Sequence, residues 1–330
     1  MIEVSHSRGT YQIRFDSVVS AIQSDAALVD EHVFKLWGSR LELTCPVYVV
    51  PAGETSKSIN EFGRIQEFLA AVPVRRSGQI AVIGGGVTGD LGGFVASTYM
   101  RGIRYLQIPT TLLAMVDSSV GGKVAVDLDA GKNLVGSFYP PESVVIATEF
   151  LSTLPARQVK NGMAEAWKTA FIMDESLLPL CEKPGDYQDL VSRCVTHKRT
   201  VVMEDEFEVT GRRAILNFGH TIGHAIEAAT GYESLLHGEA VAIGMSLEAL
   251  LGERMGVTQE GTAEFVTEKL QLAGFELDNP CKGRTEHLIE LMKRDKKATR
   301  AGLSFAFLER IGACKLVHDV PETLVREVME

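Results

Sequence analysis

The chain has 330 residues, of which 45% are hydrophobic and 23% are charged, and its formal net charge is -10. This balance is typical of a globular protein with room for substantial hydrophobic cores, and the length suggests about two domains. The negative charge disfavours binding of nucleic acid over the whole surface, so an anionic ligand would need a local basic pocket.

Cysteine usage and the opening residues indicate the compartment. The five cysteines are scattered, and no two have the C-x-x-C spacing of a metal or redox motif. Their odd number argues against a disulfide framework. The start, MIEVSHSRGT, lacks the apolar segment of a secretion signal, and no apolar run approaches the roughly 20 residues that span a bilayer. We therefore expect a cytoplasmic protein.

The first half of the chain alternates short β-branched runs with helix-like stretches. An amphipathic helix is predicted over 59–72, and strands are predicted at 47–53, 79–86, 102–111 and 142–149. Such alternation predicts an α/β domain built on a parallel sheet.

From about residue 156 onward, long helical patterns dominate the sequence. Helices are predicted at 159–173, 186–204, 217–229, 237–255, 259–273 and 284–294, and a hairpin is predicted over 303–317. We therefore expect an α/β domain over 1–155 and a mainly α-helical domain over 156–330. A cleft between two such domains is a usual place for a small-molecule site.

A glycine loop follows the strand predicted at 79–86. Residues 84–89, GGGVTG, fit the pattern G-x-G-x-x-G, which lets backbone N–H groups approach a pyrophosphate at a helix N-terminus. A purely structural turn is the alternative. Asp90 follows at once and would repel a phosphate unless it faces elsewhere, and no strand ending in an acidic residue lies about 20 residues further on. The loop predicts nucleotide binding in a non-standard geometry.

A set of histidines and one glutamate has the composition of a metal site. His220, His224 and His237 lie within 217–245, and the first two share one helix face because they are four residues apart. Glu165 lies in GMAEAWK, three residues before Lys168. Two imidazoles and a carboxylate are usual ligands of a catalytic zinc. Each histidine alone could be an ordinary core residue, but the glycine beside each one indicates close approach of backbone or ligand.

Basic residues gather in glycine-rich segments. The segment 117–136, DSSVGGKVAVDLDAGKNLVG, sets Lys123, Lys132 and Asn133 among small residues. Lysines in such loops suit recognition of phosphate or carboxylate better than they suit a solvated face. Further cationic candidates lie outside the segment, at Arg101, Lys198, Arg213 and the DKK of 295–297.

Six motifs in a fixed order identify a family. They are VIGGGVTGDLGGF, IPTTLLAMVDSSVGGK, GKNLVGSFYPP, GMAEAWK, NFGHTIGHAIE and LHGEAVAIGM, and with them the chain resembles 3-dehydroquinate synthase from about residue 30 to 312. The resemblance implies a homodimeric lyase with a Rossmann-like NAD-binding domain and a helical domain that binds zinc or cobalt. It implies conversion of 3-deoxy-arabino-heptulosonate 7-phosphate to 3-dehydroquinate and phosphate, in the shikimate pathway of aromatic amino acid biosynthesis.

The resemblance also assigns roles to individual positions. The implied metal ligands are Glu165, His220 and His237. The implied catalytic residues are Asp117, Lys123, Lys168, Asn217 and His224. The implied substrate-binding residues are Arg101, Lys123, Asn133, Lys198, Arg213, Asn217 and Lys297, and Arg101 would reach the site of the neighbouring subunit. The implied NAD contacts are Asp30, Glu54, Lys57, Gly85, Gly86, Val87, Asp90, Thr110, Thr111, Leu113, Asp117, Lys132 and Thr153.

Some positions depart from the family pattern, and other functions stay open. Gln158 stands where the family usually has glutamate, and His32 stands where asparagine is common, near Asp30 at the adenosine end of the expected NAD site. Sugar phosphate cyclases that make inososes or valiolones share the core motifs. A metal-dependent polyol dehydrogenase and a non-catalytic binding protein that keeps the fold are two further alternatives.

Overall fold

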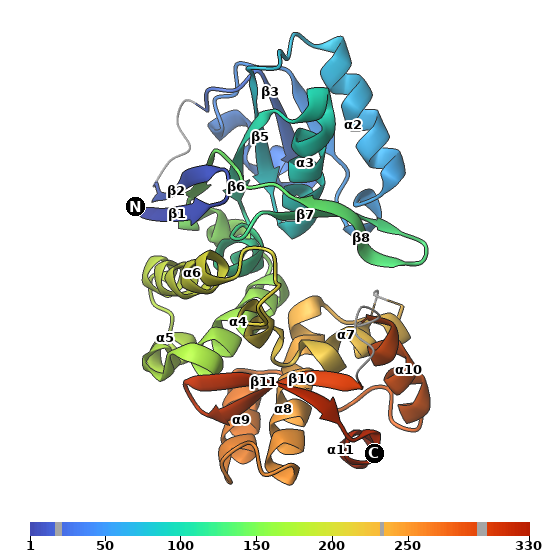
Figure 1. The fold of residues 1–330 in the computed structure, drawn as a ribbon. Coiled ribbons are helices and arrows are strands. Elements are labelled where there is room, and N and C mark those ends of the chain that lie inside the picture. The colour runs from blue at the N-terminus through green and yellow to red at the C-terminus, as the bar shows by residue number, and fades with distance from the viewer. Residues whose placement is uncertain (17–21, 232–233, 296–301) are drawn as a thin grey trace. The chain divides into compact units, whose positions relative to one another are not determined.

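A computed structural model of the chain describes residues 1–16, 22–231, 234–295 and 302–330. The chain forms two compact units (Figure 1). The first unit contains residues 1–159 and 187–207, and the second contains 160–186 and 208–330. The expected boundary near 155 lies close to the end of the first segment, but residues 187–207, which hold the helix predicted over 186–204, belong to the first unit.

The first unit is built on a seven-stranded sheet of order β1-β2-β9-β6-β5-β3-β4. All neighbouring strands run parallel except β1 and β2. The predicted parallel sheet is confirmed, with strands at β4, β5, β6 and β9. The bounds are β1 Ile2–His6, β2 Gly9–Phe15, β3 Ala26–Asp30, β4 Val47–Val50, β5 Gln79–Gly84, β6 Arg104–Pro109 and β9 Ser143–Ile146.

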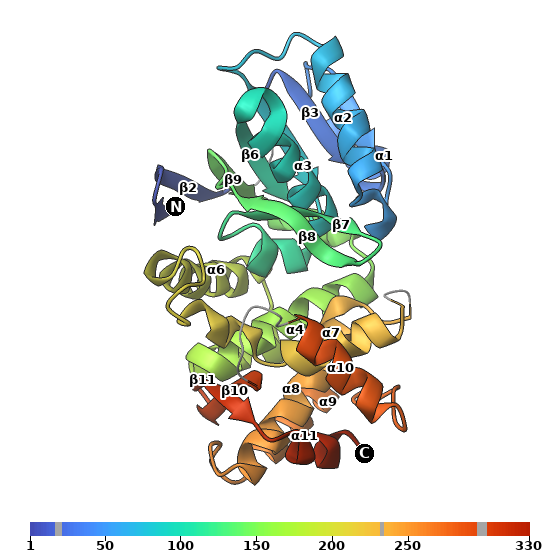
Figure 2. The same cartoon turned by 45° about the vertical axis from the view of Figure 1, so that its right-hand side comes forward.

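Helix α3 (Gly86–Thr98) packs against β5 and β6 and also against a hairpin, β7 (Lys123–Leu128) with β8 (Gly131–Phe138). Figure 2 shows α3 behind this hairpin. A Cβ atom on Gly92 would lie 2.6 Å from the Val82 side chain, and one on Gly93 would lie 2.4 Å from that of Val124. The glycines therefore let one helix pack closely on two sides.

Further helical segments complete the first unit. Helix α1 spans Glu31–Trp37, α2 spans Ile59–Ala71 as predicted, and α6 spans Tyr187–Glu204. A π-helix spans Ala114–Ser118, and 3₁₀ segments span Gly38–Arg40, Glu54–Ser56, Tyr99–Arg101 and Thr148–Thr153.

The second unit is mainly helical, as predicted. Its helices are α4 (Ala156–Met173, which begins at the end of the first unit), α5 (Leu178–Glu182), α7 (His220–Ala229), α8 (His237–Arg254), α9 (Thr262–Leu272), α10 (Thr285–Asp295) and α11 (Glu322–Met329), with 3₁₀ segments at Glu175–Leu177 and Arg213–Asn217. The predicted hairpin is β10 (Leu303–Arg310) with β11 (Ala313–Val320). Among the described residues, no helix combines the length and apolarity needed to cross a membrane.

Each unit contains a hydrophobic core among its described residues. The first core lies between the sheet and α2 and α3, and the completely buried Ile65 and Leu69 are among its residues. The second core joins α7, α8, α10 and the β10–β11 hairpin around Phe305 and Phe307, whose rings stack with centroids 5.5 Å apart. Helices α7 and α8 also pack against each other, which fixes the two helix starts that carry the candidate metal ligands.

Candidate metal and nucleotide sites

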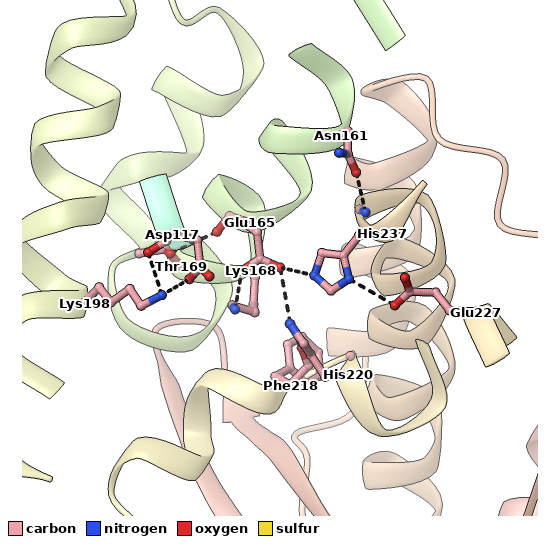
Figure 3. A network of polar contacts seen from close by, with 12 residues as sticks. Asp117, Asn161, Glu165, Lys168, Thr169, Lys198, Phe218, His220, Glu227 and His237 are labelled. Carbon is pink, nitrogen blue, oxygen red and sulfur yellow. Dashed lines mark hydrogen bonds and ion pairs between the residues drawn. The ribbon is translucent and has the colours of Figure 1, made fainter. Parts of the chain in front are cut away.

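Three side chains from three helices converge in the second unit (Figure 3). Glu165 belongs to α4, and His220 and His237 are the first residues of α7 and α8. The Glu165 Oε1 atom lies 3.5 Å from Nε2 of His220 and 3.6 Å from Nε2 of His237. Ligands at about 2.1 Å around a tetrahedral zinc would be about 3.4 Å apart. The three side chains therefore fit one divalent ion, as the resemblance implies.

The charges of this cluster suit a metal. Glu165 is buried, and burial alone would raise the pKa of its carboxyl, but Lys168 and the two histidines outweigh burial and hold the pKa well below its usual range. Burial and Lys168 hold the pKa of His220 well below its usual value. A carboxylate and a neutral imidazole are the protonation states that metal binding requires.

His237 differs from His220 in its surroundings. Burial disfavours its charged form, but hydrogen bonds with Glu165 and Glu227 outweigh burial and raise the pKa of His237 to about 10. Its Nδ1 lies 3.0 Å from Oε2 of Glu227, whereas Nδ1 of His220 lies 3.1 Å from the carbonyl oxygen of Phe218. Both rings are therefore held through Nδ1 while Nε2 faces Glu165.

Buried side chains fix the starts of the two helices that carry the candidate histidine ligands. The Gly238 N–H donates to Oδ1 of Asn161 on α4, at 2.6 Å. The N–H groups of Gly219 and Ile222 donate to the two carboxylate oxygens of Glu248 on α8, at 2.7 and 3.0 Å. These bonds satisfy helix N-termini that would otherwise be buried without partners. The sequence analysis missed Asn161, Glu248 and Glu227, although Glu227 lies seven residues after His220 on the same helix face.

Glycines bring the three helices together. A Cβ atom on Gly238 would lie 2.1 Å from the carbonyl oxygen of Asn161, and one on Gly244 would lie 1.9 Å from that of Gly219. Gly219 has the left-handed φ of 80° and precedes His220 directly. The close backbone approach predicted from the glycines beside the histidines is thus confirmed.

Other predicted residues of the second unit surround the cluster. The His224 ring centroid lies 5.2 Å from that of His220 and 5.9 Å from that of His237. Lys168 pairs with Glu165. Arg213 is buried, and Asn217 is half-buried at the end of the 3₁₀ segment that leads toward α7. Lys297 lies outside the described residues, as does Lys296.

The glycine loop of the first unit forms the N-terminus of α3. Gly85 is the N-cap, Gly86 and Val87 open the helix, and no side chain among the described residues caps this end. The Thr110 N–H donates to the Gly84 carbonyl at 3.0 Å, and a Cβ atom on Gly85 would lie 2.9 Å from the Thr111 side chain. The loop therefore combines a narrow backbone surface with helix N–H groups, which fits a dinucleotide phosphate.

The Asp90 carboxylate forms an ion pair with Lys57. This pairing compensates the negative charge that would otherwise repel a bound phosphate. The Lys57 Nζ lies 2.6 Å from Asp90 Oδ2 and donates to Asn133 Oδ1 at 2.5 Å. Lys57 is buried, and burial would lower its pKa, but Asp90 outweighs burial and raises the pKa. The Asn133 N–H donates to Asp127 at 2.7 Å, and Lys132 lies 3.6 Å from Glu54. These contacts tie the hairpin to the expected cofactor residues.

The loops expected over 117–136 proved to be the β7–β8 hairpin, so that expectation was wrong for most of the segment. The valines alternate with small and polar residues, as in a half-buried strand, and the glycines obscured this pattern. Lys123 is exposed as the first residue of β7, and Asn133 has a left-handed φ of 57°. The Asn133 side chain accepts a hydrogen bond from Lys57, one of the expected NAD contacts.

Several further predicted residues of the first unit take part in hydrogen bonds or ion pairs. Leu113 is the N-cap of the π-helix, and Asp117 lies within that helix. The Oδ1 and carbonyl oxygen of Asp117 lie 2.6 and 2.7 Å from Lys198 Nζ. Asp30 caps α1 by accepting from the N–H groups of His32 and Val33, and the hydroxyl of Thr153 accepts from Trp37. Arg101 is exposed, with a φ of 69°, at the turn after α3.

Comparison with known proteins decides the family. The profile described as 3-dehydroquinate synthase N-terminal matches residues 47–161, and the one described as 3-dehydroquinate synthase C-terminal matches residues 162–298. The chain belongs to the 3-dehydroquinate synthase family. It is 44% identical to the 3-dehydroquinate synthase of Dictyoglomus thermophilum, over 88% of this chain and 84% of that protein. It is also 44% identical to that of Opitutus terrae, over 92% and 87% of the two chains.

Solved structures confirm the fold of this 3-dehydroquinate synthase family member. A 2-deoxy-scyllo-inosose synthase complexed with carbaglucose-6-phosphate, NAD+ and Co2+ is 29% identical, covers 99% of this chain and 98% of its own, and superimposes with a TM-score of 0.85. The 2-epi-5-epi-valiolone synthase of Streptomyces hygroscopicus, with NAD+ and Zn2+, is 26% identical over 100% and 97% of the two chains, with a TM-score of 0.87. Identity is higher to the 3-dehydroquinate synthases than to these inosose and valiolone enzymes.

Proposed function

We propose that this chain converts 3-deoxy-arabino-heptulosonate 7-phosphate to 3-dehydroquinate and phosphate, using NAD and a divalent metal, zinc or cobalt. The substrate is oxidised transiently at C5, loses phosphate, is reduced again at C5, and closes its ring by an intramolecular aldol step. Because the oxidation at C5 is reversed later in the reaction, there is no net redox change, and the overall reaction is that of a lyase. The observation that carries this proposal is the Glu165–His220–His237 cluster with Lys168, in a chain that matches both family domains.

The residues of the second unit have distinct tasks in this proposal. Glu165, His220 and His237 would hold the divalent ion, which would supply Lewis acidity that makes an alcohol easier to deprotonate and oxidise. Lys168 keeps Glu165 ionised within a buried site, so that the carboxylate stays available as a ligand. Arg213 is proposed to bind the substrate carboxylate, because guanidinium groups bind carboxylates in a bidentate geometry. Asn217, His224 and Lys297 are proposed phosphate contacts.

The residues of the first unit are proposed to bind NAD. The N-terminus of α3 offers backbone N–H groups to the pyrophosphate, and the Lys57–Asp90 pair holds the adjoining carboxylate in place. The other implied contacts, Asp30, Glu54, Thr110, Thr111, Leu113, Asp117, Lys132 and Thr153, are proposed on the family resemblance. Lys123, Asn133 and Lys198 stay proposed substrate residues on the same ground.

The proposal extends to assembly and compartment. A homodimer is proposed from the family resemblance, with Arg101 contributing to the phosphate site of the neighbouring subunit. Light scattering, which measures the molar mass in solution, tests for the dimer. Cytoplasmic location is proposed because all five cysteines are free, three of them buried, as expected in a reducing compartment. Fractionation of cells tests the location.

The test is a product assay with purified protein, NAD and zinc or cobalt. The heptulosonate phosphate should yield phosphate and 3-dehydroquinate in equal amounts, without net NADH, and a chelator should stop the reaction until metal is restored. His220→Ala should lower turnover at least about a hundredfold, since catalysis depends on the metal. Phosphate release from a hexose or heptulose phosphate alone, giving an inosose or valiolone, would refute the assignment. Net NADH from a polyol would indicate a dehydrogenase instead.

A further inference from the structure

We infer that Glu227 is a positioning residue of the metal centre, which orients the His237 ring toward the ion and strengthens metal binding without being a ligand. This inference rests on the metal site of the proposed function. It assigns a role to a side chain that lies behind the three ligands, on the far side of one imidazole.

The two nitrogens of His237 face different partners. Nδ1 lies 3.0 Å from Glu227 Oε2, and Nε2 lies 3.6 Å from Glu165 Oε1, where the ion would lie between the ligands. A carboxylate at Nδ1 selects the tautomer that leaves Nε2 free to ligate, and it makes the ring a stronger donor. The Glu227 side chain is 6% exposed, so water competes little for this contact.

The position of Glu227 follows from the packing of α7 on α8. His220, His224 and Glu227 lie at spacings of four and three residues, on one face of α7. A Cβ atom on Gly223 of the same helix would lie 3.1 Å from the carbonyl oxygen of Ala240 on α8, so the two backbones are in close contact. Helix α7 thus carries one ligand, His220, and orients the ligand that begins α8.

The two ligand histidines differ in what holds them. Nδ1 of His220 lies 3.1 Å from a backbone carbonyl oxygen, that of Phe218, which no substitution of a side chain removes. Nδ1 of His237 depends on a carboxylate, which can be removed. The negative charge of that carboxylate also attracts the positively charged metal centre, which a neutral carbonyl group does only weakly. Substitution of Glu227 therefore isolates orientation and charge at one ligand.

A competing role for Glu227 can be separated by counting ions. His224, Glu227 and His237 also present ligand atoms within 4.8 Å of one another, so Glu227 as a ligand would imply a second ion. In that arrangement, Nδ1 of His237 would bind the second ion instead of contacting Glu227. The positioning role requires one zinc or cobalt ion per chain in the wild type and in every Glu227 variant.

The experiment compares Glu227→Ala and the nearly isosteric Glu227→Gln with the wild type. Metal dissociation constants are measured by competition with a chromophoric chelator, together with the visible spectrum of the cobalt-loaded protein. Removal of such a partner typically weakens metal binding by about 10–100-fold. We expect that range for Glu227→Ala, and a smaller loss for Glu227→Gln because its amide oxygen still accepts from Nδ1. Both variants should shift the cobalt bands.

Glu253→Ala is the matched control. Glu253 lies near the other end of α8, and its carboxylate accepts from the Ala263 N–H at 2.8 Å to hold the start of α9. The control should lower the unfolding temperature and leave the metal dissociation constant and the cobalt spectrum unchanged. The dissociation constant of NAD, bound by the first unit, should be unchanged in all three variants.

The outcomes separate the inference from the proposed function. Metal binding by Glu227→Ala and Glu227→Gln within about twofold of wild type would overturn the inference. So would equal weakening by Glu253→Ala, or two ions in the wild type and one in Glu227→Ala. A wild-type chain that binds neither zinc nor cobalt would overturn the proposed function itself, and the inference with it.

Discussion

Replacing Gly244 with alanine tests how closely α7 and α8 must approach for the metal site to form. The new methyl carbon would lie 1.9 Å from the Gly219 carbonyl oxygen and 2.9 Å from the Gly223 nitrogen, whereas real Cβ atoms essentially never come within 3.0 Å. Both atoms belong to the backbone, so no side chain can turn away. Helix α7 would have to move by about 1 Å, because close-packed interiors leave no space for the extra methyl group.

The magnitude follows from two opposing effects. Overpacking of a close-packed core costs about 1–3 kcal/mol, and a clash with backbone belongs at the upper end of this range. Alanine is favoured over glycine within a helix by about 1 kcal/mol, which offsets part of the cost. Gly244→Ala should therefore lower the free energy of unfolding by about 2 kcal/mol. Displacement of His220 with α7 should also weaken metal binding at least about tenfold, since ligand distances tolerate only about 0.2 Å.

The assay is urea unfolding of the metal-free protein, with metal affinity measured separately by chelator competition. Gly63→Ala is the matched control, because Gly63 lies within α2 and a Cβ atom there meets no atom within 4 Å. The control should raise the free energy of unfolding by about 0.5–1 kcal/mol. Equal stability of Gly244→Ala and the wild type, with the control behaving as expected, would refute the close approach of α7 and α8.

Three further predictions concern the cofactor, the substrate and the metal. Lys57→Met removes the cation that pairs with Asp90, so it should lower the free energy of unfolding by about 3 kcal/mol and abolish NAD binding. Calorimetry measures the NAD affinity, and an unchanged value would contradict the role of this pair. Lys198→Met removes both contacts to Asp117. Under the proposed function it should raise KM at least about tenfold, which corresponds to the loss of a charged hydrogen bond of about 1.5 kcal/mol. Steady-state kinetics measure KM, and an unaltered value would count against a substrate role. Metal removal should lower the free energy of unfolding by about 2.7 kcal/mol, compared with protein in a free metal concentration of about 100 times Kd. Equal melting curves with and without chelator would argue against a metal that binds the folded state.

Periodicity and motif order predicted much of the fold. The strands from residue 47 onward that carry β-branched runs, and most of the long helices, appear where the patterns place them, because their burial is regular. The β7–β8 hairpin was missed because glycines interrupt its alternation. Strand β3, AALVD, was missed because it is short and its first four residues are buried, so no polar alternation marks it.

The candidate ligands could be named from the sequence, but the partners behind them could not. The histidines and Glu165 indicate metal chemistry by their residue types, and the family resemblance selects Glu165, His220 and His237 among them. Asn161 and Glu248 act only through contacts with backbone N–H groups on other helices, at sequence separations of 77 and 29 residues. Nothing local distinguishes such an Asn or Glu from a surface residue, so only the packed structure shows their role.

Helix α6 belongs to the first unit although the chain has already entered the second at residue 160. During synthesis, at about 5–20 residues per second, an N-terminal unit usually folds first. Here that unit lacks α6, and so the Lys198 partner of Asp117, until residues 160–207 have also been made. The two units must therefore mature together, and a fragment cut near residue 155 should expose the surface that α6 covers instead of folding as an independent NAD-binding domain.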